Sequence, residues 1–187
     1  MEDQTLTETK KKLLDATERL IYAGGICATG MDLIVKSSGV ARKTIYRYFR
    51  TKDELVAEAL RKRDERWMNW FMTECEKGGT PVDKLLGTFD ALEQWFFSSD
   101  FRGCAFINAA GEIGDANDPI RAVAKEHKVK LRNYLLHLTK EYGADDPEAL
   151  ASEFLILIDG AITVALVMND KEAARKAQHL ARKLLKS

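Results

Sequence analysis

A glycine-containing turn between two short helical patterns constrains the fold of this chain more than any other feature. Apolar residues recur at helical spacing on both sides of Ser38-Gly39-Val40. Gly39 suits a tight turn because glycine adopts positive φ angles without a steric penalty. Two helices joined by such a turn form the helix-turn-helix arrangement. The pattern predicts one helix at about residues 29–37, opened by a capping box of Thr29 and Asp32, and a second at about 42–49.

A further helix, at about residues 6–23, is predicted to cover this pair. Its apolar face contains Leu13, Leu20 and Ile21. These side chains can form a small core with the apolar positions in and around the turn, which are Ile34, Val35, Val40, Ile45 and Phe49. Burial of that side of helix 42–49 leaves its other side in solvent. The candidates for the exposed side are Arg42, Lys43, Thr44, Tyr46, Arg47 and Tyr48.

The turn and its second helix lie in a basic stretch of an otherwise neutral protein. The formal net charge is zero, with 29 Lys and Arg against 29 Asp and Glu. Between Asp32 and Asp53 no acidic residue occurs, whereas the basic residues there are Lys36, Arg42, Lys43, Arg47, Arg50 and Lys52. A local basic patch on a neutral protein is typical of polyanion binding, although a solvated basic face has the same composition.

Double-stranded DNA is the polyanion that such a helix fits best. Arg and Lys pair with guanine O6 and N7 in the major groove, and the N-terminal residues of a recognition helix reach the bases. Arg42 and Lys43 are therefore predicted to contact base edges, with Arg47 as a further candidate. Thr, Tyr and Lys more often contact phosphates, which fixes the register of the protein on the duplex. The predicted phosphate contacts are Thr29, Thr44, Tyr46, Tyr48 and Lys52.

The rest of the chain is also predicted to be helical, with about nine helices in all. No segment alternates apolar and polar residues as a strand does, and each of the three prolines stands where a helix can begin. Basic character gives way to aromatic residues near Arg63–Trp67, which divides the chain into domains of residues 1–64 and 65–187. The six further helices are expected at about 52–77, 81–97, 104–113, 119–142, 147–168 and 170–185.

Enzymes, metalloproteins and membrane proteins find no support in the sequence. Motifs of serine hydrolases, phosphate-binding loops and zinc proteases are absent, so neither catalysis nor a metal or cofactor is expected. The longest apolar stretch, residues 154–168, is shorter than the ~20 residues of a membrane span. The N-terminus lacks the apolar core of a signal peptide, and a soluble cytoplasmic protein is expected. Cys27, Cys75 and Cys104 are widely spaced and expected to be buried, reduced thiols.

Residues 29–60 resemble the DNA-binding domain of the TetR/AcrR-type transcriptional regulators. Three positions depart from the family pattern: Gly30 replaces a small hydroxyl residue, Lys43 replaces a frequent Gly, and Ala41 replaces the Ser that usually caps the recognition helix. The missing cap should cost about 1 kcal/mol locally, and it leaves the start of this helix less defined. The residues that match the pattern are Thr29, Gly39-Val40, Thr44-x-Tyr46-x-x-Phe49 and Lys52-Asp53-x-Leu55.

The resemblance implies that the C-terminal part is a helical bundle that binds a small molecule. Helical bundles form apolar pockets with a few polar groups, and residues 101–112 are similar to a segment that lies beside the pocket in many members of the family. Asn108, Glu112 and His127 are the candidates that would orient a ligand, although each of them can equally serve in a structural or surface hydrogen bond. The candidate apolar lining is Trp67, Trp70, Phe71, Phe89 and Phe106.

The last two helices are expected to form a dimer interface. The helix at 147–168 is apolar over most of its circumference, and such a helix is buried on several sides. The resemblance implies that the partner is the same pair of helices in a second copy, which would place two recognition helices on a near-palindromic DNA site. The candidate interface residues are Leu155, Ile158, Asp159, Ile162, Ala165 and Leu166.

These expectations combine into a homodimeric repressor that a small molecule releases from its DNA operator. Three other interpretations of the function remain open at this point. A regulator without any ligand would have a solid C-terminal core, and a redox sensor would use Cys27 or Cys104 as its switch. An activator is also compatible, because the sign of regulation depends on where the operator lies.

Overall fold

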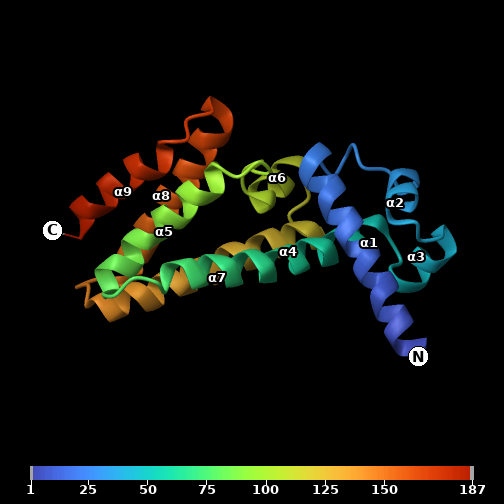
Figure 1. Cartoon of the computed structure of the whole chain (residues 1–187), viewed down its shortest axis with the longest axis horizontal. Helices are drawn as coiled ribbons and strands as arrows, with labels where there is room; N and C mark the ends of the chain where they lie inside the picture. The colour runs from blue at the N-terminus through green and yellow to red at the C-terminus, as the bar shows by residue number, and fades with distance from the viewer. Residues whose placement is uncertain (1, 186–187) are drawn as a thin grey trace. The chain divides into compact units, whose positions relative to one another are not determined.

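The computed structural model describes residues 2–185, with the side chains of residues 7–185. These residues form nine α-helices and no strand, which confirms the predicted all-helical fold (Figure 1). The chain divides into two compact units, Met1–Glu65 with Ala105–Glu126, and Arg66–Cys104 with His127–Ser187.

The first unit begins with three helices, α1 (Glu2–Gly24), α2 (Met31–Ser38) and α3 (Arg42–Tyr48), followed by the first part of α4 (Lys52–Cys75). Helix α1 begins earlier than the predicted range 6–23. The three helices and α4 share one small core, as the apolar pattern predicts. Its buried members are Leu13, Leu14, Ile34, Val40, Ile45, Phe49, Leu55 and Ala59.

The turn between α2 and α3 has the predicted geometry. Gly39 has φ 67° and ψ 10°, in the left-handed region that favours glycine, and its amide donates to the Val35 carbonyl at 3.0 Å. The amide of Val40 donates to the Ser38 hydroxyl at 3.2 Å. At the start of α3, Ala41 makes no side-chain cap, in agreement with its departure from the family pattern.

The predicted capping box of Thr29 and Asp32 is wrong. Helix α2 begins after Gly30, which provides no side-chain cap. The Thr29 hydroxyl instead donates backwards to the Gly25 carbonyl at 2.6 Å. The Thr29 hydroxyl therefore closes the turn that follows α1. It does not accept a hydrogen bond from the Asp32 amide, as a capping box requires.

The first unit also contains α6 (Ala105–Glu112) and the first part of α7 (Pro119–Tyr142). The first division of the chain lies inside α4 after Glu65, near the predicted boundary at residues 64 and 65, whereas the sequence analysis placed residues 105–126 in the C-terminal domain. Helix α6 buries Ala105, Phe106 and Ala109. The Arg121 guanidinium donates to the Ala110 carbonyl at 2.7 Å and so joins α7 to α6.

The second unit is a bundle in which α5 (Pro81–Phe96), α8 (Pro147–Met168) and α9 (Ala173–Leu184) pack side by side (Figure 1). The prolines of α5 and α8 stand at the first helical turn, as predicted. The start of α5 has a complete capping box: Thr80 accepts from the Asp83 amide at 3.1 Å, and Asp83 accepts from the Thr80 amide at 3.1 Å.

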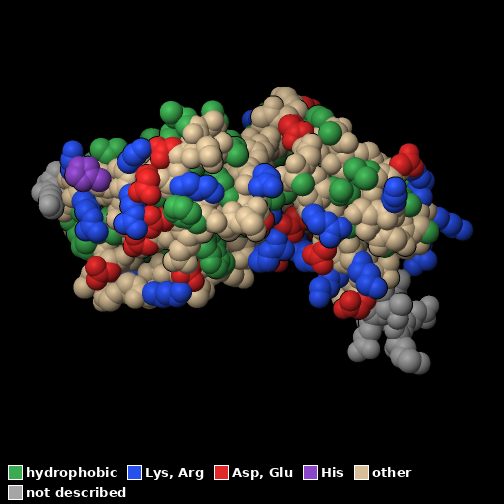
Figure 2. All heavy atoms as spheres, turned by 45° about the horizontal axis from the view of Figure 1, so that its top comes forward, with side chains coloured by type: hydrophobic (Ala, Val, Ile, Leu, Met, Phe, Trp, Pro, Cys, Tyr) green, Lys and Arg blue, Asp and Glu red, His purple; other side chains and the backbone are tan. Residues whose placement is uncertain are grey.

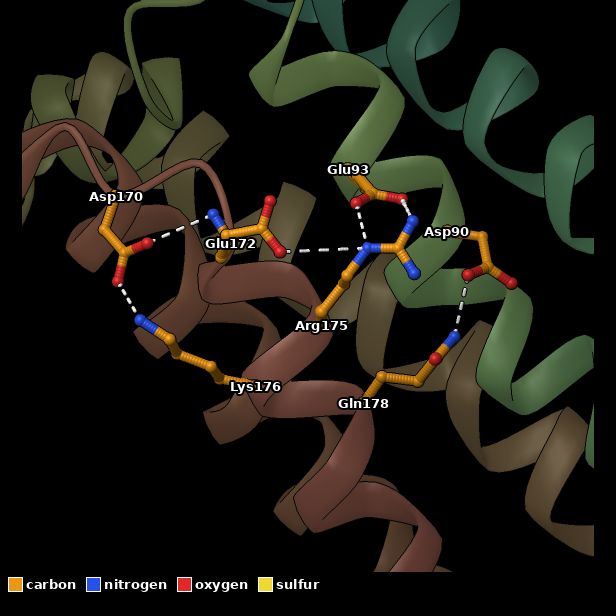
Figure 3. Close-up of polar contacts among 7 residues, drawn as sticks. All are labelled: Asp90, Glu93, Asp170, Glu172, Arg175, Lys176 and Gln178. Atoms are coloured by element: carbon orange, nitrogen blue, oxygen red, sulfur yellow. Dashed lines mark hydrogen bonds and ion pairs between the residues drawn. The ribbon is translucent and has the colours of Figure 1, made fainter.

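Helix α9 lies against α5 through small buried residues and a polar rim (Figure 3). Arg175 donates through Nη2 to Glu93 at 2.9 Å, and Gln178 donates to Asp90 at 2.8 Å. Exposed pairs of this kind contribute little to stability, so the burial of four alanines of α9 within the bundle contributes more. These buried alanines are Ala173, Ala174, Ala177 and Ala181.

The contrast between two neighbouring residues of α3 gives a test of this packing. Ile45 is 1% exposed, whereas Tyr46 is 47% exposed. We expect Ile45→Ala to lower the free energy of unfolding by about 2–5 kcal/mol, because a cavity replaces buried methyl groups. Tyr46→Ala should change it by no more than about 0.5 kcal/mol. Urea-induced unfolding followed by circular dichroism measures both, and equal losses would contradict the assignment of Ile45 to the core.

Candidate DNA-binding site

Helix α3 presents one polar face to solvent and one apolar face to the core. Arg42, Lys43, Tyr46 and Arg47 are exposed, and they follow one another at intervals that keep them on one side of a helix. The opposite side carries Ile45, which the core buries. Thr44 is half-buried beside this face. The predicted exposure of four of these side chains is thus confirmed, while their contacts with DNA stay predictions.

The exposed face of α3 is basic, and one acid stands beside it. Lys and Arg side chains lie on the outer surface of the α2–α3 region, in the right-hand part of Figure 2. The Arg42 guanidinium forms an ion pair with the Asp32 carboxylate of α2. The Asp32 side chain is 98% exposed and that of Arg42 is 47% exposed, so both remain accessible. Sequence patterns did not indicate this pair, because its partners lie on different helices.

Three of the residues that are predicted to contact phosphate instead contact other groups of the protein. Thr29 is only 2% exposed, and its hydroxyl is bonded to Gly25, so the predicted contact of this side chain with phosphate is not supported. The Lys52 ammonium donates to the Ile26 carbonyl at 2.7 Å. Tyr48 is half-buried and packs against the core, with its ring centroid 6.4 Å from that of Phe49. Helical periodicity predicts the outward face, but it does not show which groups find an internal partner.

The second unit brings several of the candidate ligand-binding residues into one aromatic cluster. The Trp67 ring stacks on Phe71 at 4.7 Å between centroids and meets Trp70 edge-on at 6.1 Å. Trp95, which the sequence did not single out, and His127 approach the same ring at 5.6 and 5.4 Å. His127 is 2% exposed. The indole N–H of Trp67 is buried and has no hydrogen-bond partner among the described residues.

The other candidate ligand-binding residues lie elsewhere. Phe89 packs against Phe154 in the core of the second unit, with centroids 5.8 Å apart. Phe106, Asn108 and Glu112 belong to α6 in the first unit. Both carboxylate oxygens of Glu112 accept backbone hydrogen bonds from the turn after α1, so a role in orienting a ligand is not supported for this residue.

The predicted interface residues of α8 fall on two different faces. Ile158, Ile162 and Ala165 are at most 2% exposed and pack inside the monomer, so they are not available to a second copy. Leu155 is half-buried, and Asp159 pairs with Lys128 at 2.5 Å. Only Leu166 of this set is exposed, at 40%. Burial argues against the three buried residues, because composition does not show which side of an apolar helix packs in its own bundle, while Leu155, Asp159 and Leu166 stay predictions.

The outward face of α8 carries a different row of residues. Ile156 and Val167 are 70% and 76% exposed, and Gly160 and Thr163 are exposed between them. The spacing of these four residues keeps them on one side of the helix. The helix has a mean hydropathy of 2.0 over 18 residues, which by length and composition alone would suit a membrane span, but a core helix of a soluble protein meets the same criterion.

The three cysteines have contrasting environments. Cys75 and Cys104 are buried, as expected, whereas the expected burial of Cys27 is wrong, because this residue lies in the exposed turn after α1. Burial raises the pKa of the Cys75 thiol to about 12, and the opposing effect of its hydrogen bond with Tyr134 is smaller. Cys75 therefore stays protonated and unreactive near neutral pH. The described residues contain no group of three His, Cys, Asp or Glu side chains that could hold a metal ion.

Two family profiles match the chain and together span most of it. Residues 13–59 match the bacterial regulatory proteins of the tetR family, and residues 81–181 match the tetracyclin repressor-like C-terminal domain. The second match alone covers more than half of the chain. The division between the two profiles lies within the segment that contains α4.

Individual relatives agree with this result. The HTH-type transcriptional regulator YjdC of Escherichia coli is 22% identical over 180 residues, which cover 95% of this chain and 93% of YjdC. The HTH-type transcriptional repressor KstR of Mycolicibacterium smegmatis is 36% identical over 78 residues, 42% of this chain and 38% of KstR.

A solved structure has the same fold over nearly the whole chain. SCO4454, a TetR-family transcriptional regulator from Streptomyces coelicolor, superposes with a TM-score of 0.87 and 26% identity, covering 96% of this chain and 95% of its own. The profile matches, the helix-turn-helix and its exposed basic face lead to one conclusion. The chain belongs to the TetR family of bacterial transcriptional regulators, which bind DNA.

Proposed function

We propose that this regulator is a cytoplasmic homodimeric repressor that reads a near-palindromic operator with α3 and leaves it when a small molecule binds. The observation that carries the proposal is the two-sided character of α3, in which Ile45 is buried and Arg42, Lys43, Tyr46 and Arg47 are exposed. A helix held in this way suits the major groove, where long donors reach base edges. The name of KstR as a repressor supports repression as the sign of regulation.

The outward row of α8 supports the homodimer. Ile156 and Val167 expose large apolar side chains, and Gly160 between them has open space where a Cβ would lie. Exposed apolar surface of this kind marks an interaction site, and a small residue at its centre permits close approach of another helix. A second copy is the occupant because a two-fold axis would also present two α3 helices to a symmetric DNA site.

The aromatic cluster around Trp67 supports the small-molecule effector. Its buried indole N–H has no partner among the described residues, and a buried donor without a partner is costly. A ligand with an apolar body and one acceptor atom would satisfy the donor and stack on the neighbouring rings. Such a ligand can shift the equilibrium only by its different affinities for the DNA-bound and free states.

The first prediction is that the protein selects a near-palindromic duplex from a random-sequence DNA pool at a stated salt concentration. Arg42→Ala should weaken binding to that duplex by about 1–3 kcal/mol and relax the preference at one position of each half-site. Lys36→Ala, on α2, is a control that removes an exposed basic residue outside the α3 face. Absence of any enriched sequence with folded protein at low salt would contradict DNA reading by α3.

The ion pair of Asp32 with Arg42 generates a second prediction. Asp32→Asn should release the guanidinium for phosphates, raise affinity for non-specific DNA and steepen the slope of log K against log salt by about 0.9. Asp15→Asn removes the same charge from a pair with Lys62 in the first unit, at 2.6 Å, and should leave the slope unchanged. Fluorescence anisotropy with a non-specific duplex measures the affinity and the salt slope of each variant. Equal slopes in the two variants would contradict the proposed effect of the Asp32–Arg42 ion pair on DNA binding.

The α8 row generates a third prediction. The double variant Ile156→Glu with Val167→Glu should be monomeric, because two charges would be buried without partners in the proposed interface. Met72→Glu changes another exposed apolar residue, 37% exposed on α4, and should leave the dimer intact. Analytical ultracentrifugation distinguishes these states, and a wild-type protein that sediments as a monomer at high concentration would refute the interface.

A further inference from the structure

The turn that joins α1 to α2 is held from two sides by side chains distant in the sequence. Glu112, the last residue of α6, accepts a hydrogen bond from the Ile26 amide at 3.0 Å through Oε1 and from the Cys27 amide at 2.9 Å through Oε2. From the other side, Lys52 of α4 donates to the Ile26 carbonyl at 2.7 Å. Side chains of two other helices therefore bind both backbone groups of Ile26, and all these residues lie in the first unit.

The turn is also closed by its own hydrogen bonds. The Thr29 amide donates to the Ile26 carbonyl at 3.2 Å, and the Thr29 hydroxyl donates to the Gly25 carbonyl at 2.6 Å. Helix α2 begins at Met31, directly after this closed turn and Gly30. A shift of the turn would consequently move the N-terminal end of α2.

Gly25 leaves space for the Glu112 carboxylate because it has no side chain. Its φ is +90°, in the region that side chains rarely adopt, and a Cβ there would lie 3.0 Å from Glu112 Oε2 and 3.2 Å from Oε1. A larger residue there would adopt a strained backbone conformation and would require the carboxylate to shift by a few tenths of an ångström. The contact between α6 and the turn thus depends on this glycine as well as on Glu112.

Helix α6 packs in the first unit through small buried residues, whereas Glu112, at its C-terminal end, is exposed. Ala105 and Ala109 are 8% and 1% exposed. Between α6, α1 and α4 remains a cavity of only about 10 Å³, lined in part by Tyr22, Arg63 and Asn108. Such a volume holds about one water molecule, which indicates close packing.

We propose that Glu112 is a positioning residue for DNA binding, which fixes the α1–α2 turn and thereby the orientation of α2 and α3. The proposal rests on the proposed function of α3. The physical link from α2 to α3 is the shared core, because Ile34 of α2 and Ile45 of α3 are both fully buried in it. A close-packed core transmits a displacement instead of absorbing it.

The test compares three variants in the full-length protein, with the duplex selected from the random pool as the probe. Glu112→Ala removes both acceptors, and with them two hydrogen bonds to a charged group, and should weaken binding to that duplex by at least about tenfold. Glu112→Gln offers one oxygen to two amides and should lie between wild type and Glu112→Ala. Asp115→Ala is the matched control, because Asp115 also accepts a backbone hydrogen bond, from Asn117 at 2.9 Å, and carries the same charge.

Hydrogen exchange measured by NMR separates positioning from general stability. In Glu112→Ala, the amides of Ile26 and Cys27 should exchange faster, while amides of the α1 and α4 interior keep their wild-type protection. All affinities are measured at a temperature where circular dichroism shows every variant folded. Unchanged operator affinity in Glu112→Ala, an equal loss in Asp115→Ala, or unchanged exchange at the two amides would each overturn the proposal. Failure of the wild-type protein to select any duplex would overturn the proposed function of α3, and this proposal with it.

Discussion

Burial of Ile45 against α1 and α2 is the contact on which the DNA-binding surface depends. Helix α3 has seven residues, far too few to be stable alone in water, so packing and not propensity keeps it folded. The partners of Ile45 in the core include Leu13 and Ile34, each with no exposed surface. This anchoring also decides which side chains face outward. The same contact thus stabilises the helix and aims its basic face at solvent.

The DNA-binding unit is not a continuous stretch of chain. Helix α6 lies in the middle of the C-terminal part of the sequence, yet it packs with α1 and α4 and supplies Glu112 to the turn after α1. The same region contains a buried ion pair of Glu18 with Arg63, at 2.7 Å, and the Arg63 guanidinium lies 3.6 Å from the centre of the Tyr22 ring. Removal of one partner of such a pair is strongly destabilising, because the other charge would remain buried.

Helix α8 has two apolar sides with different surroundings. Its inner side, with Phe154 and Ile158, completes the core of the second unit. Its outer side leaves Ile156 and Val167 in solvent, which is unusual for a helix of such hydropathy. The outer row is mostly exposed in the monomer, and its apolar character is the basis of the proposed association.

Features governed by local backbone chemistry could be predicted from the sequence. The Gly39 turn, the capping box at the start of α5, the proline-initiated helices and the outward face of α3 all follow from residues within a few positions of one another. Their hydrogen bonds and periodicity involve near neighbours, so the order of residues is sufficient. The match to the TetR pattern likewise rests on one short stretch, residues 29–60, which is why it could be recognised before the fold was known.

Features that need a partner from a distant part of the chain were decided only by the tertiary structure. Glu112 and Ile26 are 86 positions apart, and nothing in the order of residues distinguishes a carboxylate that binds a turn from one that would bind a ligand. Lys52 was assigned to DNA by pattern, yet folding brings its ammonium group to the carbonyl of Ile26 in the turn after α1. The inner and outer faces of α8 are both apolar, so composition could not separate them. In each case packing determines the role, because a polar or apolar group finds its partner only when distant helices come together.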